Sequence, residues 1–329
     1  MRKSILRKIT VAGLIVIMSL FVFSGCEFKS DTPIVGKIVG LKSDEIFKTG
    51  KIVCSKAEYM LAMLDAVKKY QTDFGGKIDW QAKVDDDITF EEFVKEKVKE
   101  DITVRYTLAA MAKNNNVSLS AAEKDDIKKS ASDYYAVMTD EEKDYTGAQL
   151  NDVENLYMYY KLADKVYSGI TKNAGNDISE EDARVIKIQY IRMDASIEKT
   201  AKIKSLLKDI KSVVEGGYQE FSREAKQYSC DDTFEREIKK SEALAKYEIE
   251  AFNLNKGKIS DIIEDGTNYY LVYCVDNYMK EETAENKQNI IDNAKERSFN
   301  EQYGKFVKEA DCDFNSSQWK KIEVFKQVK

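Results

Sequence analysis

The ten residues Ala251–Ser260 read AFNLNKGKIS, and they contain the change of pattern that decides the fold of the second half of the chain. The apolar residues up to Leu254 fit the end of a short helix. Lys256-Gly257 closes this helix, because glycine readily adopts the left-handed conformation in which many helices end. Two alternating, strand-like stretches follow, separated by an Asp-Gly turn. The predicted elements are a helix over 244–254, strands over 258–263 and 268–275, and a turn at Asp265-Gly266.

Upstream of this segment, the same domain is predicted to begin with a strand and helices. Val185–Met193 alternates and is rich in β-branched residues, which favours a strand. Residues 197–214 have a helical pattern that ends at Gly216-Gly217, and Phe221–Tyr228 fits another short helix. The order of strand, long helix, short helices and two strands predicts a small α+β domain over residues 178–280.

The first half of the chain is predicted to be mostly helical, because signals for helix starts recur in it. A Ser or Thr followed three residues later by Glu forms a capping box, in which each side chain bonds the other residue's backbone N–H. Such boxes begin at Ser55, Thr89, Ser120 and Thr139. Residues 34–54 before them have a β-like pattern. We therefore expect a helical domain over residues 35–177, with strands near its start.

The N-terminal 25 residues have the pattern of an export signal. Four basic residues precede the apolar run Ile9–Phe23, which is short for a membrane span. Ser24-Gly25-Cys26 follows and resembles the lipobox at which lipoprotein signal peptidase cuts. We expect removal of residues 1–25, a lipid anchor on Cys26, a tether over 26–34, and a location on the extracytoplasmic face of the cell membrane. The alternatives are an ordinary signal peptide and an uncleaved anchor helix.

The composition argues against several classes of function. The chain has 52 basic and 58 acidic residues, and loss of the signal peptide with its four basic residues would leave 48 basic residues and a net charge of −10. This charge argues against nucleic acid as a partner. The chain contains no histidine, which excludes histidine-activated nucleophiles and histidine metal sites. With no glycine-rich phosphate loop either, we expect no metal and no cofactor. Pairing of the other cysteines stays open.

Several segments of the second half resemble the parvulin rotamase domain of PrsA- and SurA-type foldases, in the order of that family. Phe221–Ser229 reads FSREAKQYS and resembles the family's FxxxAxxYS helix. Ala251–Ser260 resembles its AFxLxxGxIS segment. Val185–Ile191 stands where the family has a first strand ending in HIL, and Tyr269–Val272 where its last strand reads GYHII. The resemblance implies a parvulin-like fold, with a small antiparallel sheet and surrounding helices, after a helical SurA-N-like domain.

After Glu281 the sequence predicts one long helix and a short tail. The apolar residues of the helix recur at helical spacing up to Phe306. The tail around Trp319–Phe325 has the pattern of a strand. In the foldases the last helix packs back onto the N-terminal helices, so the resemblance implies that residues 281–329 complete the N-terminal domain.

The resemblance also implies where a catalytic site would lie. In parvulins, two histidines and a Cys or Asp form a polar network beside the prolyl amide. Aligned on the motifs above, Tyr190 and Tyr270 stand at the histidine positions and Asp231 at the Cys/Asp position. Because both histidines are replaced, the catalytic site is predicted to be degenerate, with weak or no activity.

The residues around that site are changed as well. Tyr247 and Phe252 fall on the aromatic wall of the parvulin substrate pocket, and Leu244 falls near its aliphatic partner. The family's Gly-Gly-x-Leu-Gly loop should lie near 237–242, where this chain reads EIKKSE. Since that loop shapes the pocket mouth, its loss argues against isomerase activity as much as the missing histidines do.

These observations favour a membrane-anchored extracytoplasmic chaperone or foldase that binds unfolded or proline-containing exported polypeptides. In this interpretation Tyr190 and Tyr270 are ordinary strand residues, and Asp231 is a solvated loop acid. Five tyrosines of the helical half would serve as core or as a hydrophobic cradle: Tyr134, Tyr135, Tyr157, Tyr159 and Tyr160. The alternatives are an active peptidylprolyl isomerase with a Tyr-Asp-Tyr network, and a solute-binding lipoprotein, against which the helical run argues. A homodimer stays open.

Overall fold

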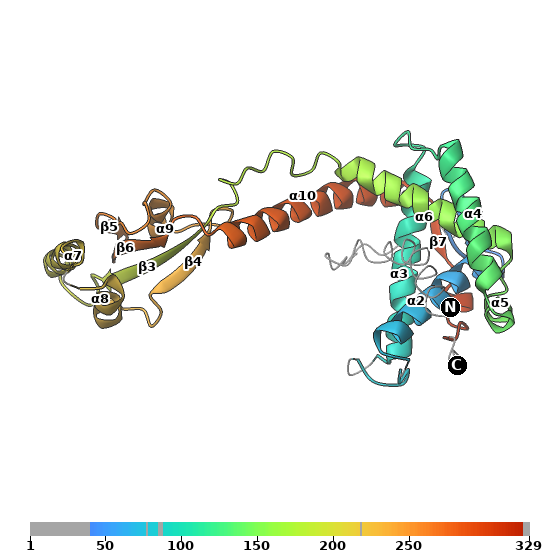
Figure 1. Cartoon of the computed structure of the whole chain (residues 1–329), viewed down its shortest axis with the longest axis horizontal. Helices are drawn as coiled ribbons and strands as arrows, with labels where there is room; N and C mark the ends of the chain where they lie inside the picture. The colour runs from blue at the N-terminus through green and yellow to red at the C-terminus, as the bar shows by residue number, and fades with distance from the viewer. Residues whose placement is uncertain (1–39, 77, 85–87, 218, 325–329) are drawn as a thin grey trace, which may run out of the picture. The chain divides into compact units, whose positions relative to one another are not determined.

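The computed structural model describes residues 40–76, 78–84, 88–217 and 219–324 (Figure 1). These residues form two compact units. Unit 1 combines the residues up to Lys172 with those from Glu296 onward, and unit 2 contains those from Asn173 to Lys295. The predicted signal peptide, Cys26 and the tether over 26–34 lie outside the described residues. No helix among the described residues is long and apolar enough to cross a membrane.

Helices make up most of unit 1, and the capping boxes mark their starts. They are α2 (Lys56–Asp73), α3 (Phe90–Met111), α4 (Ala121–Val137), α5 (Asp140–Thr146) and α6 (Leu150–Thr171). The first four begin directly after the predicted Ser or Thr caps. At α2, the Glu58 N–H donates to Ser55 Oγ at 3.1 Å and the Ser55 N–H donates to the Glu58 carboxylate at 2.9 Å. The predicted helical half is confirmed.

A small antiparallel sheet in unit 1 joins the two ends of the described chain. Its strands β1 (Glu45–Thr49), β2 (Ile52–Ser55) and β7 (Cys312–Phe314) have the order β2-β1-β7. The predicted tail strand around Trp319 was wrong, because Ser316–Trp319 forms helix α11. The reason is local, since the Asn315 side chain accepts a hydrogen bond from the Gln318 N–H at 3.2 Å and caps the helix.

The C-terminal part of helix α10 (Lys280–Glu309) packs against the N-terminal helices within unit 1. Phe299 and Tyr303 of α10 are buried with apolar residues of α3 and α6. Those partners are Leu108, Met111, Ala163 and Val166. The last helix therefore completes the core of unit 1, as the foldase resemblance implied.

The tyrosines of the helical half belong to the core of unit 1. Tyr157 and Tyr160 are buried, while Tyr134, Tyr135 and Tyr159 are partly buried and pack against the same apolar cluster. Some of their hydroxyls bond buried acids, as when Tyr134 donates to the Asp65 carboxylate at 2.7 Å. The structure therefore supports the core interpretation of these residues rather than the cradle.

Unit 2 is built on a four-stranded antiparallel sheet with the order β4-β3-β6-β5. Its strands are β3 (Val185–Asp194), β4 (Glu235–Lys239), β5 (Ile263–Asp265) and β6 (Asn268–Asp276). The strands β3 and β6 lie near the predicted bounds. The strand expected over 258–263 is shorter, because β5 begins only at Ile263, and Ile259 forms an isolated bridge to Tyr273.

Helices cover both faces of this sheet. They are α7 (Thr200–Glu215), α8 (Phe221–Tyr228) and α9 (Lys246–Ala251). Apolar residues of α9 pack with Tyr190 and Tyr270 on one face, while those of α7 and α8 pack with Ile191 and Leu271 on the other. Neighbouring strand residues point to opposite faces, which explains this division. A helical unit and a unit with an antiparallel sheet confirm the predicted α+β class.

Candidate functional site

The predicted site residues come together on the α9 face of the four-stranded sheet. Tyr190 lies on β3, Tyr270 on β6 and Tyr247 on α9, and Phe252 is the C-cap residue of α9. The ring centroids are 5.3 Å apart for Tyr190 and Tyr247, and 6.4 Å apart for Tyr190 and Tyr270. The rings of Tyr247 and Tyr270 stack with an interplanar angle of 8° at 4.3 Å. We call Tyr190, Tyr247 and Tyr270 the tyrosine stack.

The tyrosine stack is nearly fully buried. Its members are between 5% and 9% exposed, and Phe252 beside them is 8% exposed. Leu244 is partly buried and packs against the same cluster. The Arg184 guanidinium lies 5.2 Å from the centroid of the Phe252 ring and donates to the Phe252 carbonyl at 2.8 Å. The aromatic wall is therefore covered by its own neighbours.

The hydroxyls of the stack are held by groups of the protein. The Tyr190 hydroxyl donates to the Thr233 carbonyl at 3.0 Å. The Tyr247 hydroxyl accepts from Arg236 at 2.8 Å and donates to Glu248 at 3.1 Å, while Arg236 and Glu248 form an ion pair at 2.7 Å. These two phenols are thus engaged in internal contacts.

Tyrosine hydroxyls are uncharged near neutral pH, and burial moves the pKa values of the stack further from that range. Burial raises the pKa of Tyr190, and the nearby Asp231 raises that pKa further. Burial likewise raises the pKa of Tyr247 and the pKa of Tyr270 above the ordinary value of 10.0. The stack is therefore suited to packing and to neutral hydrogen bonds, and not to proton transfer.

Asp231 is in contact with a cation and is not the solvated loop acid of the sequence hypothesis. Its carboxylate accepts from Arg192 Nε at 2.8 Å and lies 2.7 Å from Arg192 Nη2. Arg192 also donates to the Asn268 side chain at 2.8 Å. The contact with Asp231 raises the pKa of the Arg192 guanidinium. Through these contacts Arg192 of β3 connects Asp231, in the loop before β4, with Asn268 of β6.

The segment over 237–242 also differs from the expected loop at the pocket mouth. Glu235–Lys239 forms strand β4, which pairs with β3, and Ile238 is buried against the tyrosine-stack cluster. This segment forms a strand because the sheet can bury the apolar side chain of Ile238. A glycine-rich loop would have no such side chain to bury. Sequence reasoning therefore missed Arg236, because only the pairing of β4 brings it to Tyr247.

A prolyl isomerase must bind the twisted amide better than the planar forms, which requires a slot for the proline ring and free hydrogen-bond donors beside it. On the α9 face the rings of the tyrosine stack pack against one another, and the hydroxyls of Tyr190 and Tyr247 have internal partners. Among the described residues, no group of three or more acidic or cysteine side chains could hold a metal ion.

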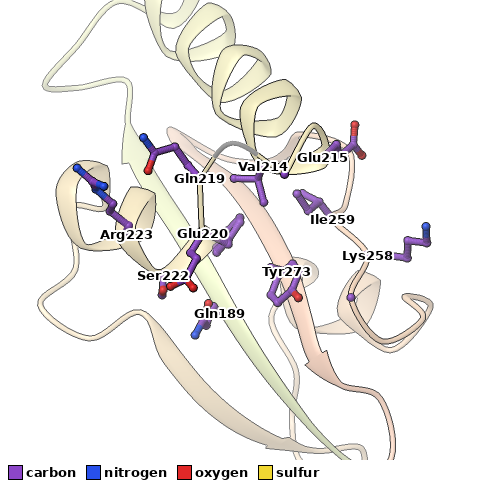
Figure 2. Close-up of a pocket in the computed structure, with 13 residues that line it drawn as sticks. Gln189, Val214, Glu215, Gln219, Glu220, Ser222, Arg223, Lys258, Ile259 and Tyr273 are labelled. Atoms are coloured by element: carbon purple, nitrogen blue, oxygen red, sulfur yellow. The ribbon is translucent and has the colours of Figure 1, made fainter.

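A pocket of about 870 Å³ lies on the other face of the same sheet (Figure 2). Sequence reasoning did not find it. Its lining includes Gln189 of β3, Tyr273 of β6, the start of α8 and the segment around Gly257. The sequence motifs gave no signal for it, because the pocket is assembled from segments that are far apart in the chain, from Gln189 to Tyr273.

Comparisons with known proteins give structural matches only. No protein-family model matches the sequence, and no curated protein matches it. One similar solved structure is the peptidylprolyl isomerase PrsA of Bacillus anthracis, with 19% identity over 64% of this chain and 94% of that chain, at a TM-score of 0.28. The foldase PrsA of Streptococcus pneumoniae has 18% identity over 75% of this chain and 97% of that chain, at a TM-score of 0.31.

A third match comes from the SurA-like chaperones PEB4 and Cj1289 of Campylobacter jejuni, with 10% identity over 83% of this chain and 99% of that chain, at a TM-score of 0.29. At these TM-scores the superpositions carry no argument about function, which rests on the residues of the chain itself.

Proposed function

We propose that this protein is a membrane-tethered extracytoplasmic chaperone that binds unfolded exported polypeptides without isomerising prolyl bonds. The observation that carries this proposal is the tyrosine stack. Under the parvulin resemblance these tyrosines stand at the catalytic and pocket positions, and their packed rings would occupy the space that a substrate's proline ring needs. A parvulin-like domain without a slot for the proline ring is suited to binding polypeptides rather than to isomerising prolyl bonds.

The barrier to prolyl rotation explains why a filled site would be inactive. Rotation about a peptide bond has a barrier of about 18–20 kcal/mol, which a catalyst lowers by favouring the twisted amide. Opening a slot beside Tyr190 would require the stacked ring of Tyr247 to leave its contact with Tyr270. It would also break the bonds that hold the Tyr247 hydroxyl to Arg236 and Glu248.

A partly exposed aromatic patch in unit 1, in which Phe74 is the exposed member, supports the binding part of the proposal. We define this patch as Tyr70, Phe74, Phe90 and Phe93, at the end of α2 and the start of α3. Phe74 is 58% exposed, and its ring centroid lies 5.8 Å from Phe90, which in turn contacts the rings of Tyr70 and Phe93. Exposed apolar patches commonly mark binding surfaces, and unfolded polypeptides present apolar and aromatic side chains.

The lipid anchor gives the binding activity a location. The basic n-region, the apolar run and Ser24-Gly25-Cys26 support cleavage before Cys26 and lipidation of its thiol. Two or more acyl chains provide lasting attachment, whereas a single chain holds weakly. A tethered chaperone would have a raised effective concentration near chains that emerge on the same membrane face.

The central experiment measures two activities of the same purified protein. In a protease-coupled assay on Xaa-Pro peptides, we expect no rate above that of the uncatalysed reaction. In a light-scattering assay, we expect the protein to suppress aggregation of a chemically denatured client at near-stoichiometric ratios. A rate enhancement that Tyr270→Phe or Asp231→Ala abolishes would show an active isomerase instead, and failure to suppress aggregation would contradict the chaperone proposal.

A separate experiment addresses the tether. Metabolic labelling with a radioactive fatty acid should mark the wild-type protein and not the Cys26→Ala protein. Because the cysteine is also needed for cleavage at the lipobox, the Cys26→Ala protein should keep residues 1–25 and have the larger mass of the precursor. A wild-type protein that takes up no label would favour the ordinary signal peptide or the uncleaved anchor helix.

A further inference from the structure

The pocket shown in Figure 2 lies on the side of the four-stranded sheet that faces away from the tyrosine stack. Gln189 and Tyr273 form a cross-strand pair on β3 and β6, next to the pair Tyr190 and Val272. Because strand residues alternate between faces, Gln189 and Tyr273 point away from Tyr190. The pocket is therefore distinct from the degenerate parvulin position.

The floor of the pocket is apolar and aromatic. The ring of Tyr273 stacks on Phe221 at a centroid distance of 5.5 Å and an interplanar angle of 19°. Phe221 is almost fully buried, whereas Tyr273, Val214 and Ile259 are only partly buried and line the pocket. The Tyr273 ring thus offers a supported surface on which an aromatic or proline side chain could stack.

The walls carry charges of both signs. Glu215 and Glu220 are acidic, Arg223 and Lys258 are basic, and all four are exposed. None of the four forms an ion pair with another described residue. Figure 2 shows Arg223 and Lys258 at opposite sides, with Gln189 and Tyr273 between them. Walls with no net charge favour neither a simple anion nor a simple cation, because each would meet a repelling side chain.

Neutral polar groups complete the pocket. Gln189, Gln219 and Ser222 line it, and amide and hydroxyl side chains can both donate and accept hydrogen bonds. One Gln189 amide hydrogen is used by Glu235 at 2.9 Å, which fixes the side chain and leaves its carbonyl oxygen available. Such groups match the alternating N–H and C=O groups of an extended polypeptide.

We propose that this pocket binds an extended segment of an unfolded polypeptide, with one aromatic or proline side chain seated against Tyr273. The inference rests on the proposed chaperone function and assigns it a site on unit 2. A volume of about 870 Å³ lies within the range of natural ligand pockets. The bound segment is selected by an aromatic anchor and by backbone hydrogen bonds, so that recognition is broad rather than specific for one client.

The first test maps contact on the full protein. The photo-crosslinker p-benzoylphenylalanine is introduced at Lys258 on the pocket wall or, as a matched control, at Ile249, which is 53% exposed on α9. The probe is reduced, carboxymethylated α-lactalbumin, which stays unfolded. We expect several-fold more crosslinking from position 258 than from position 249. Equal or stronger crosslinking from position 249 would overturn the assignment.

The second test measures affinity by fluorescence anisotropy with a labelled, neutral nonapeptide that has a central Trp. Ser222→Trp fills the pocket from its wall, and Ser196→Trp places the same side chain on an exposed turn outside it. We expect Ser222→Trp to raise the Kd about tenfold, as loss of a buried aromatic anchor commonly does. Ser196→Trp should leave the Kd unchanged, and a central Ala in the peptide should weaken its binding to the wild-type protein.

The two proposals fail in different ways. If the wild-type protein suppresses aggregation but Ser222→Trp leaves the peptide Kd unchanged, the pocket assignment is wrong and the chaperone function stands. If the peptide binds in the pocket but the wild-type protein does not suppress aggregation, the chaperone function is wrong and the peptide site stands. Equal Kd values for the Trp and Ala peptides would refute the aromatic anchor.

Discussion

The two faces of the four-stranded sheet in unit 2 use the same kind of residue in opposite ways. On the α9 face, Tyr190, Tyr247 and Tyr270 contact one another and are nearly fully buried. On the α7 and α8 face, Tyr273 stacks on Phe221 but stays partly exposed beside a pocket. A tyrosine fills a site when aromatic rings surround its own ring and its hydroxyl bonds another group of the protein. Tyr273, with one stacked neighbour, leaves space beside its ring.

This difference shows that the identity of a residue at a catalytic position does not decide function without its neighbours. Tyr190, which the sequence resemblance placed at a catalytic position, has its hydroxyl bonded to the Thr233 carbonyl. Tyr273 carries no motif signal and still borders a pocket of about 870 Å³. The comparison therefore predicts that the α9 face contributes mainly to stability and the opposite face mainly to binding.

The largest expected effect is the loss of stability when the tyrosine stack is opened. Tyr247→Ala should lower the free energy of unfolding by about 3–5 kcal/mol, because it removes a buried aromatic side chain and leaves a cavity. Tyr273→Ala should lower it by only about 1–2 kcal/mol, because that ring already borders solvent. Hydrogen exchange of the β3 and β6 amides in urea measures both. Equal losses would contradict the division between the two faces.

A second effect concerns pH, to which the tyrosine stack should be insensitive. Its pKa values lie above 10.0, and the chain has no histidine. In unit 1, by contrast, burial raises the pKa of Asp65 from 3.8 to about 6, although Tyr134 and Lys68 oppose that shift and Glu142 adds to it. The folded unit therefore binds more protons than the unfolded chain between about pH 4 and pH 6.

Unit 1 should accordingly become more stable as the pH falls through 6 towards 4, by on the order of 2 kcal/mol from Asp65 alone. Urea unfolding at several pH values, followed by hydrogen exchange in α2 and β6, separates the two units. Asp65→Asn should reduce this pH dependence at α2 and leave the part that comes from Glu58, Asp101 and Asp164, whose pKa values burial also raises. A similar pH dependence at β6 would contradict the predicted insensitivity of the tyrosine stack.

The smallest expected effect distinguishes the arginines of the two faces. Arg236→Met should cost about 1 kcal/mol, because it removes a partner of the buried Glu248, while the exposure of Arg236 itself limits the loss. Arg223→Met on the pocket wall should leave stability nearly unchanged, since no ion pair with a described residue involves Arg223. Thermal denaturation of both variants gives the comparison. A larger loss for Arg223→Met would show that the pocket wall has a structural role.

The sequence predicted local features of the fold well. The helix starts after Ser55, Thr89, Ser120 and Thr139 depend on side chains three residues apart, which the sequence displays directly. The α8 helix over Phe221–Tyr228 also has the predicted bounds. Contacts between residues close in sequence can be predicted from the sequence, because a short segment has few conformations that allow them.

Features that depend on distant partners were missed or misplaced. Strand β4 pairs with β3 across about 50 residues, and so neither its existence nor the approach of Arg236 to Tyr247 could be read from EIKKSE. The strand predicted near Trp319 was wrong for a local reason, because the Asn315 side chain caps the short helix α11 there. Strand β7 lies before that helix and is defined by its pairing with β1. The gathering of Tyr190, Tyr247 and Tyr270 was anticipated only through the parvulin resemblance, and their hydroxyl partners were not.

The pairing of β7 with β1 has a consequence for the order in which the chain can fold. A chain synthesised from its N-terminus presents α2 to α6 long before Phe299, Tyr303 and β7 exist to complete unit 1. Unit 2, which is continuous from Asn173 to Lys295, has all of its strands earlier. The core of unit 1 therefore stays incomplete until residues 299–314 have been synthesised. Removal of these residues should destabilise α2 to α6 more than it destabilises unit 2.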